Sequence, residues 1–320
     1  MLQLPHNEWR RVEVLASWVE LSALSYDNAF VARGEVLDTF NDSTLFDNPK
    51  RDVESDSSVA GTAAAMAADV WQILARRERL VGVAWPFTLD GDSLTRKDTH
   101  CTLGSTVAYT TMLLMEAAAK GWYKRLSLPK ADRVRTHFEF IVAASLSRSC
   151  KGRTTRFGAP FPAGWPRGFS KRAKHLADYF GLTVEEGKLQ TLAVAQQQDA
   201  SLDGVARLPF GDEEAGIPYL LVQCATSKNW LTNKLGQPMV ALWRQFVSWD
   251  GPILKVVAVP FVLREQHELY RASLYHEYAI ILDRLRISST APDLSISDEL
   301  KTTLVDWCTR MFQRIPVLEN

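Results

Sequence analysis

Residues 202–230 read LDGVARLPFGDEEAGIPYLLVQCATSKNW, and this stretch carries the clearest structural pattern in the chain. Its first part, LDGVARLPF (202–210), alternates well enough for a strand, and GDEEAG (211–216) has the composition of a hairpin turn. The next part, IPYLLVQCA (217–225), is an almost continuous apolar run, as expected of a central strand that is buried on both faces. The stretch therefore predicts two consecutive strands of a larger sheet.

The flanking segments extend this pattern into a mixed α/β domain. Upstream, apolar residues at helical spacing predict a helix over 132–146, and Gly181 is a suitable C-terminal cap for a second helix over 170–180. Downstream, LKVVAVPFVL (254–263) predicts a third strand, and the short run 191–195 is a further strand candidate. Helices combined with several central strands are typical of an α+β or mixed α/β fold.

A chain of 320 residues is long enough for two domains. Residues 1–128 show helical patterns, such as 106–121 with its terminal glycine, and predict a mainly helical domain for partner contact or regulation. Residues 129–320 then form the α/β domain. We expect this second domain to end in an amphipathic helix over 297–313 with Ser297 as its N-cap.

Composition excludes several classes of protein. Lysine plus arginine and aspartate plus glutamate both total 37, so the net charge gives no sign of a polyanionic partner. The cysteines at 101, 150, 224 and 308 are far apart, which argues against a zinc site or a disulfide framework. No signal peptide or membrane span is recognisable, and a cytoplasmic protein is the expectation. Motifs of zinc peptidases, nucleotide-binding loops and serine hydrolases are absent from the sequence.

Four polar residues could form a hydrolytic site for phosphodiesters. Such a site needs hard oxygen ligands around a divalent cation and a positive charge near the scissile phosphate. Asp203 begins one predicted strand, Gln223 lies in the next, and Lys228 follows that strand; Glu139 lies on the preceding helix. Together they supply three oxygen ligands and one cation.

These residues lie in segments that resemble the PD-(D/E)xK restriction-endonuclease-like superfamily. The resemblance rests on HFEFIVAASL (137–146), LDGVARLPF and QCATSKNW (223–230), with the fragments FGAP, VPF and ILDRLRI, and it covers roughly 135–285. More narrowly, the chain is similar to prokaryotic nucleases, often linked to anti-phage defence, that carry a D…QCAxxxNW signature.

The resemblance implies a DNA endonuclease that depends on Mg²⁺ or Mn²⁺. Glu139, Asp203 and Gln223 would hold the metal, and Lys228 would complete the catalytic set. The implied partners are DNA and other subunits of a defence system, and a second copy of the chain is also compatible with it.

The third motif departs from the family pattern. Where E-x-K is usual, the chain has Gln223, Cys224 and Ala225, so alanine stands in the lysine position. Lys228 or Lys234 would have to supply the missing charge. The alternative function is a catalytically inactive nuclease-fold subunit that binds DNA or assembles a multi-protein defence complex.

Each site residue also has a structural interpretation. Asp203 precedes a glycine, as many turn residues do, and helix glutamates such as Glu139 are usually solvated. Gln223 lies between apolar neighbours, where an unsatisfied amide would cost about 1–3 kcal/mol, so it needs a partner, either the backbone or a metal. Lys228 has the features of an ordinary surface lysine.

The segment 148–174 carries eight basic residues and no acidic one. Aromatic residues at 157, 161, 165 and 169 alternate with them. Basic side chains bind phosphates, and aromatic rings can stack on unpaired bases or anchor a loop. The segment predicts a nucleic-acid-binding loop, with a solvated loop over a small apolar core as the alternative. The basic residues are Arg148, Lys151, Arg153, Arg156, Arg167, Lys171, Arg172 and Lys174.

Overall fold

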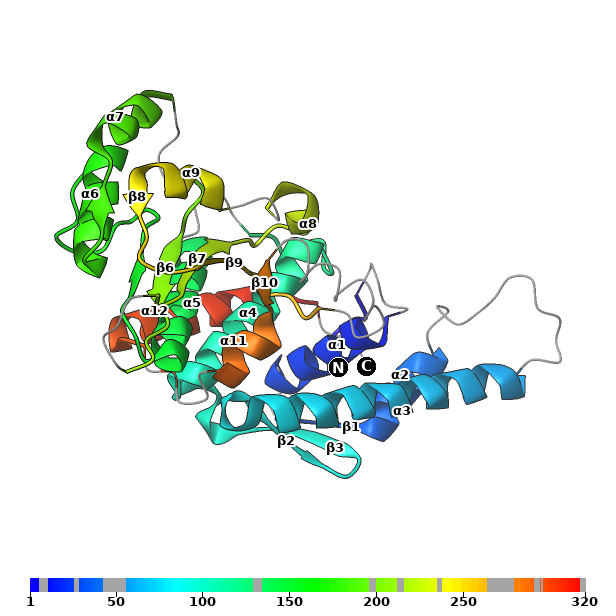
Figure 1. The fold of residues 1–320 in the computed structure, drawn as a ribbon. Helices are drawn as coiled ribbons and strands as arrows, with labels where there is room; N and C mark the ends of the chain where they lie inside the picture. Colours follow the sequence, from blue (N-terminus) through cyan, green and yellow to red (C-terminus); the bar gives the residue numbers. More distant parts are fainter. Residues whose placement is uncertain are drawn as a thin grey trace. The chain divides into compact units, whose positions relative to one another are not determined.

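The computed structural model describes residues 1–5, 11–25, 29–42, 56–128, 134–195, 200–211, 216–234, 238–263, 279–290, 294 and 296–316, with the backbone alone at 56–61 and 191–195. The chain divides into two compact units: Met1–Pro129 with Ser297–Asn320, and Lys130–Ile296. Both are drawn in Figure 1. No helix of the described ranges is long and apolar enough to span a membrane.

The first unit is mainly helical. Its helices are α1 (Val12–Ser25), α2 (Arg33–Asp42), α3 (Asp56–Val81), α4 (Gly104–Lys120) and α12 (Asp298–Phe312), with short 3-10 helices at Gly82–Ala84 and Asp98–Cys101. The helix predicted over 106–121 is α4, and Gly121 ends it in the left-handed conformation. A small antiparallel sheet was not predicted: β1 (Phe30–Ala32), β3 (Ser93–Arg96) and β2 (Phe87–Asp90), in that order.

Helix α12 corrects the predicted domain division. The sequence predicted one domain over 129–320, but the chain from Ser297 onward belongs to the first unit. The side chains of Leu304, Trp307 and Met311 are buried, and α12 packs against α4. Ser297 is the N-cap, as predicted, and its side chain accepts a hydrogen bond from the backbone N–H of Leu300 at 3.2 Å. Periodicity located the helix but could not show which core its apolar face joins.

The first unit encloses a buried charged network. The carboxylate of Glu20 accepts hydrogen bonds from Arg77, Trp85 and Tyr109, each at 2.8 Å. Arg77 also donates to the Ser17 hydroxyl at 3.1 Å. Because Glu20 and Arg77 are almost completely buried, each compensates the charge of the other.

The second unit is built on a five-stranded mixed sheet in the order β10-β9-β7-β6-β4. These strands are β4 (Thr154–Arg156), β6 (Gly204–Arg207), β7 (Tyr219–Cys224), β9 (Ile253–Ala258) and β10 (Ile280–Leu282). Strand β6 pairs antiparallel with β4 and β7, whereas β7, β9 and β10 run parallel. The three strands predicted within 202–210, 217–225 and 254–263 are thus present, and β7 is central and buried. The fold is α+β.

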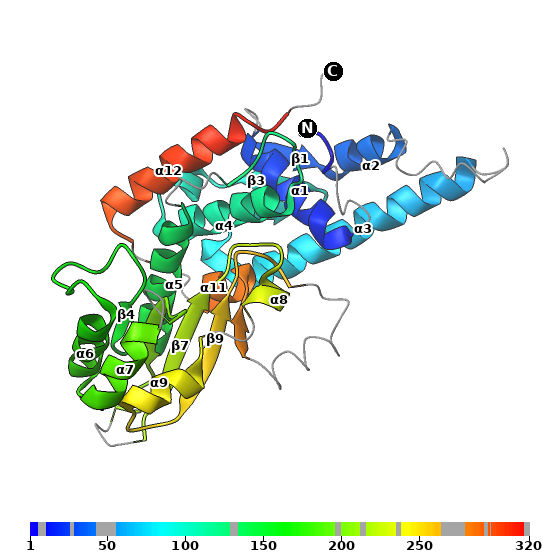
Figure 2. The same ribbon diagram turned by 90° about the horizontal axis from the view of Figure 1, so that it is seen from above.

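Helices cover this sheet. They are α5 (Val134–Cys150), α6 (Phe169–Phe180), α7 (Glu186–Ala195), α8 (Trp230–Asn233), α9 (Val240–Phe246) and α11 (Arg284–Thr290), and a two-stranded sheet joins β5 (Thr183–Val184) to β8 (Val247–Ser248). Helix α5 packs against β4, β6 and β7. Figure 2 shows α6, α7 and α9 beside one another. Gly181 caps α6 as predicted, but the strand candidate at 191–195 is wrong. Those residues continue α7, and a short apolar run cannot by itself distinguish helix from strand.

Candidate functional site

Sheet register brings the predicted site residues of two strands together. Asp203 immediately precedes β6, whose first residue, Gly204, pairs with Val222 of the antiparallel neighbour β7. The backbone N–H of Asp203 donates to the carbonyl of Val222 at 2.9 Å. Asp203 therefore lies opposite Gln223 and Cys224 at the C-terminal end of β7.

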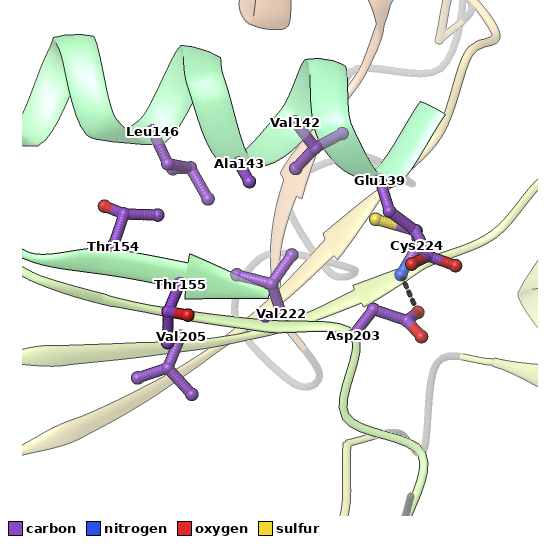
Figure 3. Close-up of a pocket in the computed structure, with 11 residues that line it drawn as sticks. Glu139, Val142, Ala143, Leu146, Thr154, Thr155, Asp203, Val205, Val222 and Cys224 are labelled. Atoms are coloured by element: carbon purple, nitrogen blue, oxygen red, sulfur yellow. Dashed lines mark hydrogen bonds between the residues drawn. The ribbon is translucent and has the colours of Figure 1, made fainter. Parts of the chain in front are cut away.

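The carboxylate of Asp203 is bound by both of these residues. Its Oδ2 accepts a hydrogen bond from the Gln223 side-chain amide. It accepts a second one from the backbone N–H of Cys224 at 2.7 Å, which Figure 3 shows as a dashed line. The same amide nitrogen donates to the Cys224 carbonyl at 3.1 Å. Because both partners are acceptors, the N–H side of the amide must face them. The nitrogen thus lies against two oxygens, as a cation would.

The other atom of the Gln223 amide, Oε1, is an acceptor. Gln223 is only 4% exposed, and within the part of the chain that the structure describes its buried Oε1 accepts no hydrogen bond. A buried acceptor without a donor costs roughly 1–3 kcal/mol. The arrangement therefore leaves an oxygen ligand available beside the Asp203 carboxylate.

Glu139 reaches the same place from α5. A Cβ atom on Gly158 would lie 3.0 Å from Oε2 of Glu139 and 3.3 Å from Oδ1 of Asp203. Gly158 is held there because the backbone carbonyl of Asp203 accepts a hydrogen bond from the N–H of Phe157 at 2.8 Å. The two carboxylates thus border a space that glycine leaves open. Figure 3 shows the side chains of Glu139, Asp203 and Cys224 grouped at one end of a pocket.

The rest of that pocket is apolar and small. Val142, Leu146, Val205 and Val222 line it away from the acids. Its volume is about 10 Å³, which is room for about one water-sized particle. The pocket can hold a small group next to the carboxylates but no substrate, so a polymer would have to bind at its polar rim.

Arg156, at the end of β4, belongs to this cluster rather than to a nucleic-acid-binding surface. It is 4% exposed and forms an ion pair with the carboxylate of Glu139. Its guanidinium also donates to the Pro160 carbonyl at 3.0 Å and lies 3.9 Å from the centre of the Phe140 ring. The prediction that Arg156 contacts DNA phosphates is corrected, because these contacts bury it.

The pKa of Cys224, on β7, depends on the charged groups around it. Burial raises the pKa of the Cys224 thiol well above its ordinary value, and the carboxylates of Asp203 and Glu139 raise it further. The Arg156 guanidinium acts in the opposite direction but does not cancel them. Cys224 is therefore a neutral thiol, not a nucleophile, and the site around it has an excess of negative charge that favours a cation.

The predicted catalytic lysine is not joined to the acids. Lys228 is exposed on the loop between β7 and α8 and forms no hydrogen bond or ion pair within the described ranges. Lys234 lies at the end of α8 and is partly exposed. Ala225, in the usual lysine position, is buried. Glu139, Asp203 and Gln223 are brought together, while Lys228 remains a neighbour on the adjoining loop.

Six of the eight basic residues of 148–174 are exposed. They are Arg148, Lys151, Arg153, Arg167, Lys171 and Lys174. Arg172, like Arg156, is buried and must be removed from the predicted contact set; its guanidinium lies 4.0 Å from the centre of the Phe161 ring. Phe157 and Phe169 belong to the apolar core, as the structural alternative expected. The segment therefore combines an anchored interior with exposed cations.

The donor set fits a hard divalent cation. Two carboxylates and one amide oxygen, the latter without a partner, are ligand types that Mg²⁺ and Mn²⁺ accept. The space beside Gly158 separates the two carboxylates. Across the described ranges, no group of three or more His, Cys, Asp or Glu side chains is arranged to hold a metal ion. The site consequently relies on Gln223 for its third protein oxygen.

Comparisons with known proteins returned no match to a family model, a curated protein or a solved structure.

Two residues of the site, Arg156 and Gly158, were not predicted from the sequence. The fragment FGAP (157–160) contained the signal for Gly158, since the resemblance included it. Nothing in the sequence marked Arg156 as different from the basic residues around it.

Proposed function

We propose that the unit Lys130–Ile296 is a nuclease domain of the PD-(D/E)xK type that hydrolyses DNA phosphodiesters with Mg²⁺ or Mn²⁺. The observation that supports this most is the convergence of Glu139, Asp203 and Gln223. The resemblance selected them from three separate segments; in the fold the carboxylates of Glu139 and Asp203 border one small space, and the Gln223 amide donates a hydrogen bond to Asp203. An accidental selection of polar residues would not be expected to converge in this way.

The division of roles follows from the contacts. Asp203 and Glu139 would hold the cation through carboxylate oxygens, and Gln223 would contribute Oε1, which accepts no hydrogen bond from the described residues. A bound divalent cation would supply Lewis-acid stabilisation of the phosphate and activation of water. Lys228, whose side chain is exposed, stabilises negative charge that develops on the phosphate.

The exposed cations of 148–174 bind the DNA backbone in this proposal. Basic side chains give salt-dependent, sequence-independent affinity. This affinity would hold a polymer at the rim of a pocket that is too small to enclose it. We further propose that the protein acts in the cytoplasm in anti-phage defence, together with other subunits, as the resemblance implies.

A second function is favoured by Ala225. It leaves β7 without a lysine next to the acids, and among the described residues Lys228 forms no hydrogen bond or ion pair that holds it in the site. A nuclease fold with that deficiency can serve as an inactive subunit that binds DNA or assembles a defence complex. Such a subunit would keep the exposed cations of 148–174 but need no bound metal.

Cleavage of DNA by the full chain distinguishes the two functions. Plasmid and single-stranded DNA are incubated with Mg²⁺ or Mn²⁺, with a chelator as the negative control. We expect cleavage by the unaltered protein and a loss of orders of magnitude in Asp203→Asn, because asparagine keeps the size but removes a charge that a hard cation needs. Circular dichroism checks that the variant is folded.

Two results would contradict the nuclease proposal. Equal cleavage by a folded Asp203→Asn protein would eliminate the proposed site. Absence of metal-dependent cleavage by the unaltered protein, even with its natural partners, would favour the inactive subunit.

A further inference from the structure

A buried arginine lies inside an acidic cluster that is proposed to bind a cation. Arg156 is 4% exposed at its side chain and Glu139 is 16% exposed, and the two are in direct contact. An arginine at such a site needs an explanation, because its charge opposes the binding of a second cation. Either it excludes the metal or it prepares the acids for it.

The arginine is fixed independently of its acidic partner. The Pro160 carbonyl accepts one of its N–H groups at 3.0 Å, and the Phe140 ring lies under the guanidinium. Burial of the whole side chain limits it to this position. Arg156 is therefore a rigid anchor, and Glu139, which is 16% exposed, is the member of the pair that lies nearer to water.

Glu139 has a reason to turn away. Its Oε2 and the Oδ1 of Asp203 flank the same point at 3.0 and 3.3 Å, and two carboxylates this close repel each other. Asp203 is held by the Gln223 amide and the Cys224 N–H, so it cannot move easily. Without a cationic anchor, Glu139 would relieve the repulsion by rotating into solvent.

We propose that Arg156 is the positioning residue of this site: it holds the Glu139 carboxylate beside Asp203 so that both acids face the space next to Gly158. This inference rests on the proposed metal-dependent function. Arg156 thus supplies the positive charge that holds Glu139 in place. Lys228, which is exposed on its loop, does not provide that charge. The cation then binds between acids that are already in place.

Two opposing effects decide the outcome of removing Arg156. Loss of its positive charge strengthens the attraction of the site for a divalent cation. Loss of the anchor releases Glu139 and leaves one carboxylate, Asp203, as the only charged ligand. We expect the second effect to dominate, because loss of a direct ligand outweighs a change of charge beyond the ligand shell.

Direct binding of Mn²⁺ to the full chain, followed by electron paramagnetic resonance, tests this. We expect Arg156→Gln to weaken binding at least about tenfold, or about 1.4 kcal/mol, and Arg156→Lys to restore part of it. In a Glu139→Gln background, Arg156→Gln should cause no further weakening, since there is no Glu139 carboxylate left to hold. The matched control is Arg207→Gln, at the other end of β6, where Arg207 pairs with Asp250 at 3.8 Å; its Mn²⁺ affinity should be unchanged.

The location of the cation is tested by Gly158→Ala. Gly158 does not have a positive φ, so the backbone accepts alanine, but the new Cβ would meet Oε2 of Glu139 at 3.0 Å. We expect a folded protein with much weaker Mn²⁺ binding. This variant also keeps the inference testable if Arg156→Gln does not fold.

Specific results would overturn the inference. Equal or tighter Mn²⁺ binding by Arg156→Gln would show that the arginine does not hold a ligand in place for the cation, and full additivity with Glu139→Gln would show that it does not act through Glu139. Unchanged binding by Gly158→Ala would move the cation elsewhere. If the unaltered protein binds no Mn²⁺, the proposed function fails and this inference fails with it, whereas binding that ignores Arg156 refutes the inference alone.

Discussion

Replacing Gln223 with glutamate places a third carboxylate in the acidic cluster. In the native protein the Gln223 amide donates to Asp203 and, at 3.1 Å, to the Cys224 carbonyl. A carboxylate of the same shape is an acceptor at both positions. Gln223→Glu therefore removes two hydrogen bonds and sets two negative charges against each other.

The cost can be bounded from these contacts. Two like charges about 4 Å apart repel by about 4 kcal/mol at an effective dielectric constant of about 20. Proton uptake limits the cost, because keeping a carboxyl of ordinary pKa about 4.3 neutral at pH 7 takes about 3.7 kcal/mol. We expect the free energy of unfolding to fall by about 3–4 kcal/mol at pH 7. Since the pKa of the new carboxyl is raised in the folded state, this loss should shrink as the pH falls toward about 4.3.

Hydrogen exchange of the β7 amides measures this stability for the second unit specifically. We expect Mg²⁺ or Mn²⁺ to restore much of the loss in Gln223→Glu, because a ligand at about 100 times its Kd stabilises the folded state by about 2.7 kcal/mol. The control is Gln223→Met, which removes the same hydrogen bonds without adding charge and should be stabilised by the cation much less than Gln223→Glu. A destabilised Gln223→Glu protein that divalent cations do not stabilise would refute the metal site, and an undiminished stability would refute the packing of Gln223 against Asp203.

Three further predictions concern other parts of the molecule. Replacing the exposed cations Lys151, Arg167 and Lys171 with alanine should weaken DNA binding, measured by fluorescence anisotropy. The slope of the logarithm of the binding constant against the logarithm of the salt concentration should flatten by about 0.7–0.9 per lost contact. An unchanged slope would mean that the segment is only a solvated surface. Glu20→Gln leaves a buried arginine without its charged partner, so urea unfolding should show a loss of about 3–5 kcal/mol in the first unit, and a loss below about 1 kcal/mol would contradict the buried network. Lys228→Ala should lower the single-turnover rate of DNA cleavage about 10²-fold while Mn²⁺ affinity stays the same, and an unaffected rate would remove this lysine from the mechanism.

Local sequence patterns predicted the elements that form the site. The run 217–225 gave β7 because a strand buried on both faces must be apolar almost throughout, and only Gln223 interrupts it. The ends of α4 and α6 were predictable because a glycine often ends a helix in the left-handed conformation, which other residues avoid. Gly121 and Gly181 adopt that conformation. Glu139, Asp203 and Gln223 could be chosen from the sequence because their segments carry the quoted resemblance.

Other features depend on contacts between distant parts of the chain. The helix at 298–312 was predictable from its apolar spacing, but its membership in the first unit follows from packing against α4, nearly two hundred residues away in sequence. The run 191–195 was ambiguous because five residues, four of them apolar, satisfy either period, and α7 includes them only as the continuation of a helix that starts at Glu186.

The division of the basic residues was decided by the tertiary structure alone. In the sequence, Arg156 and Arg172 are indistinguishable from their exposed neighbours. In the fold, Arg156 lies over the Phe140 ring and against Glu139, and Arg172 lies against Phe161, while Lys151 and Lys171 are exposed. The sequence supplies the charges of the segment, but a charge becomes structural or available to a ligand only when packing determines whether it is desolvated and which group compensates it.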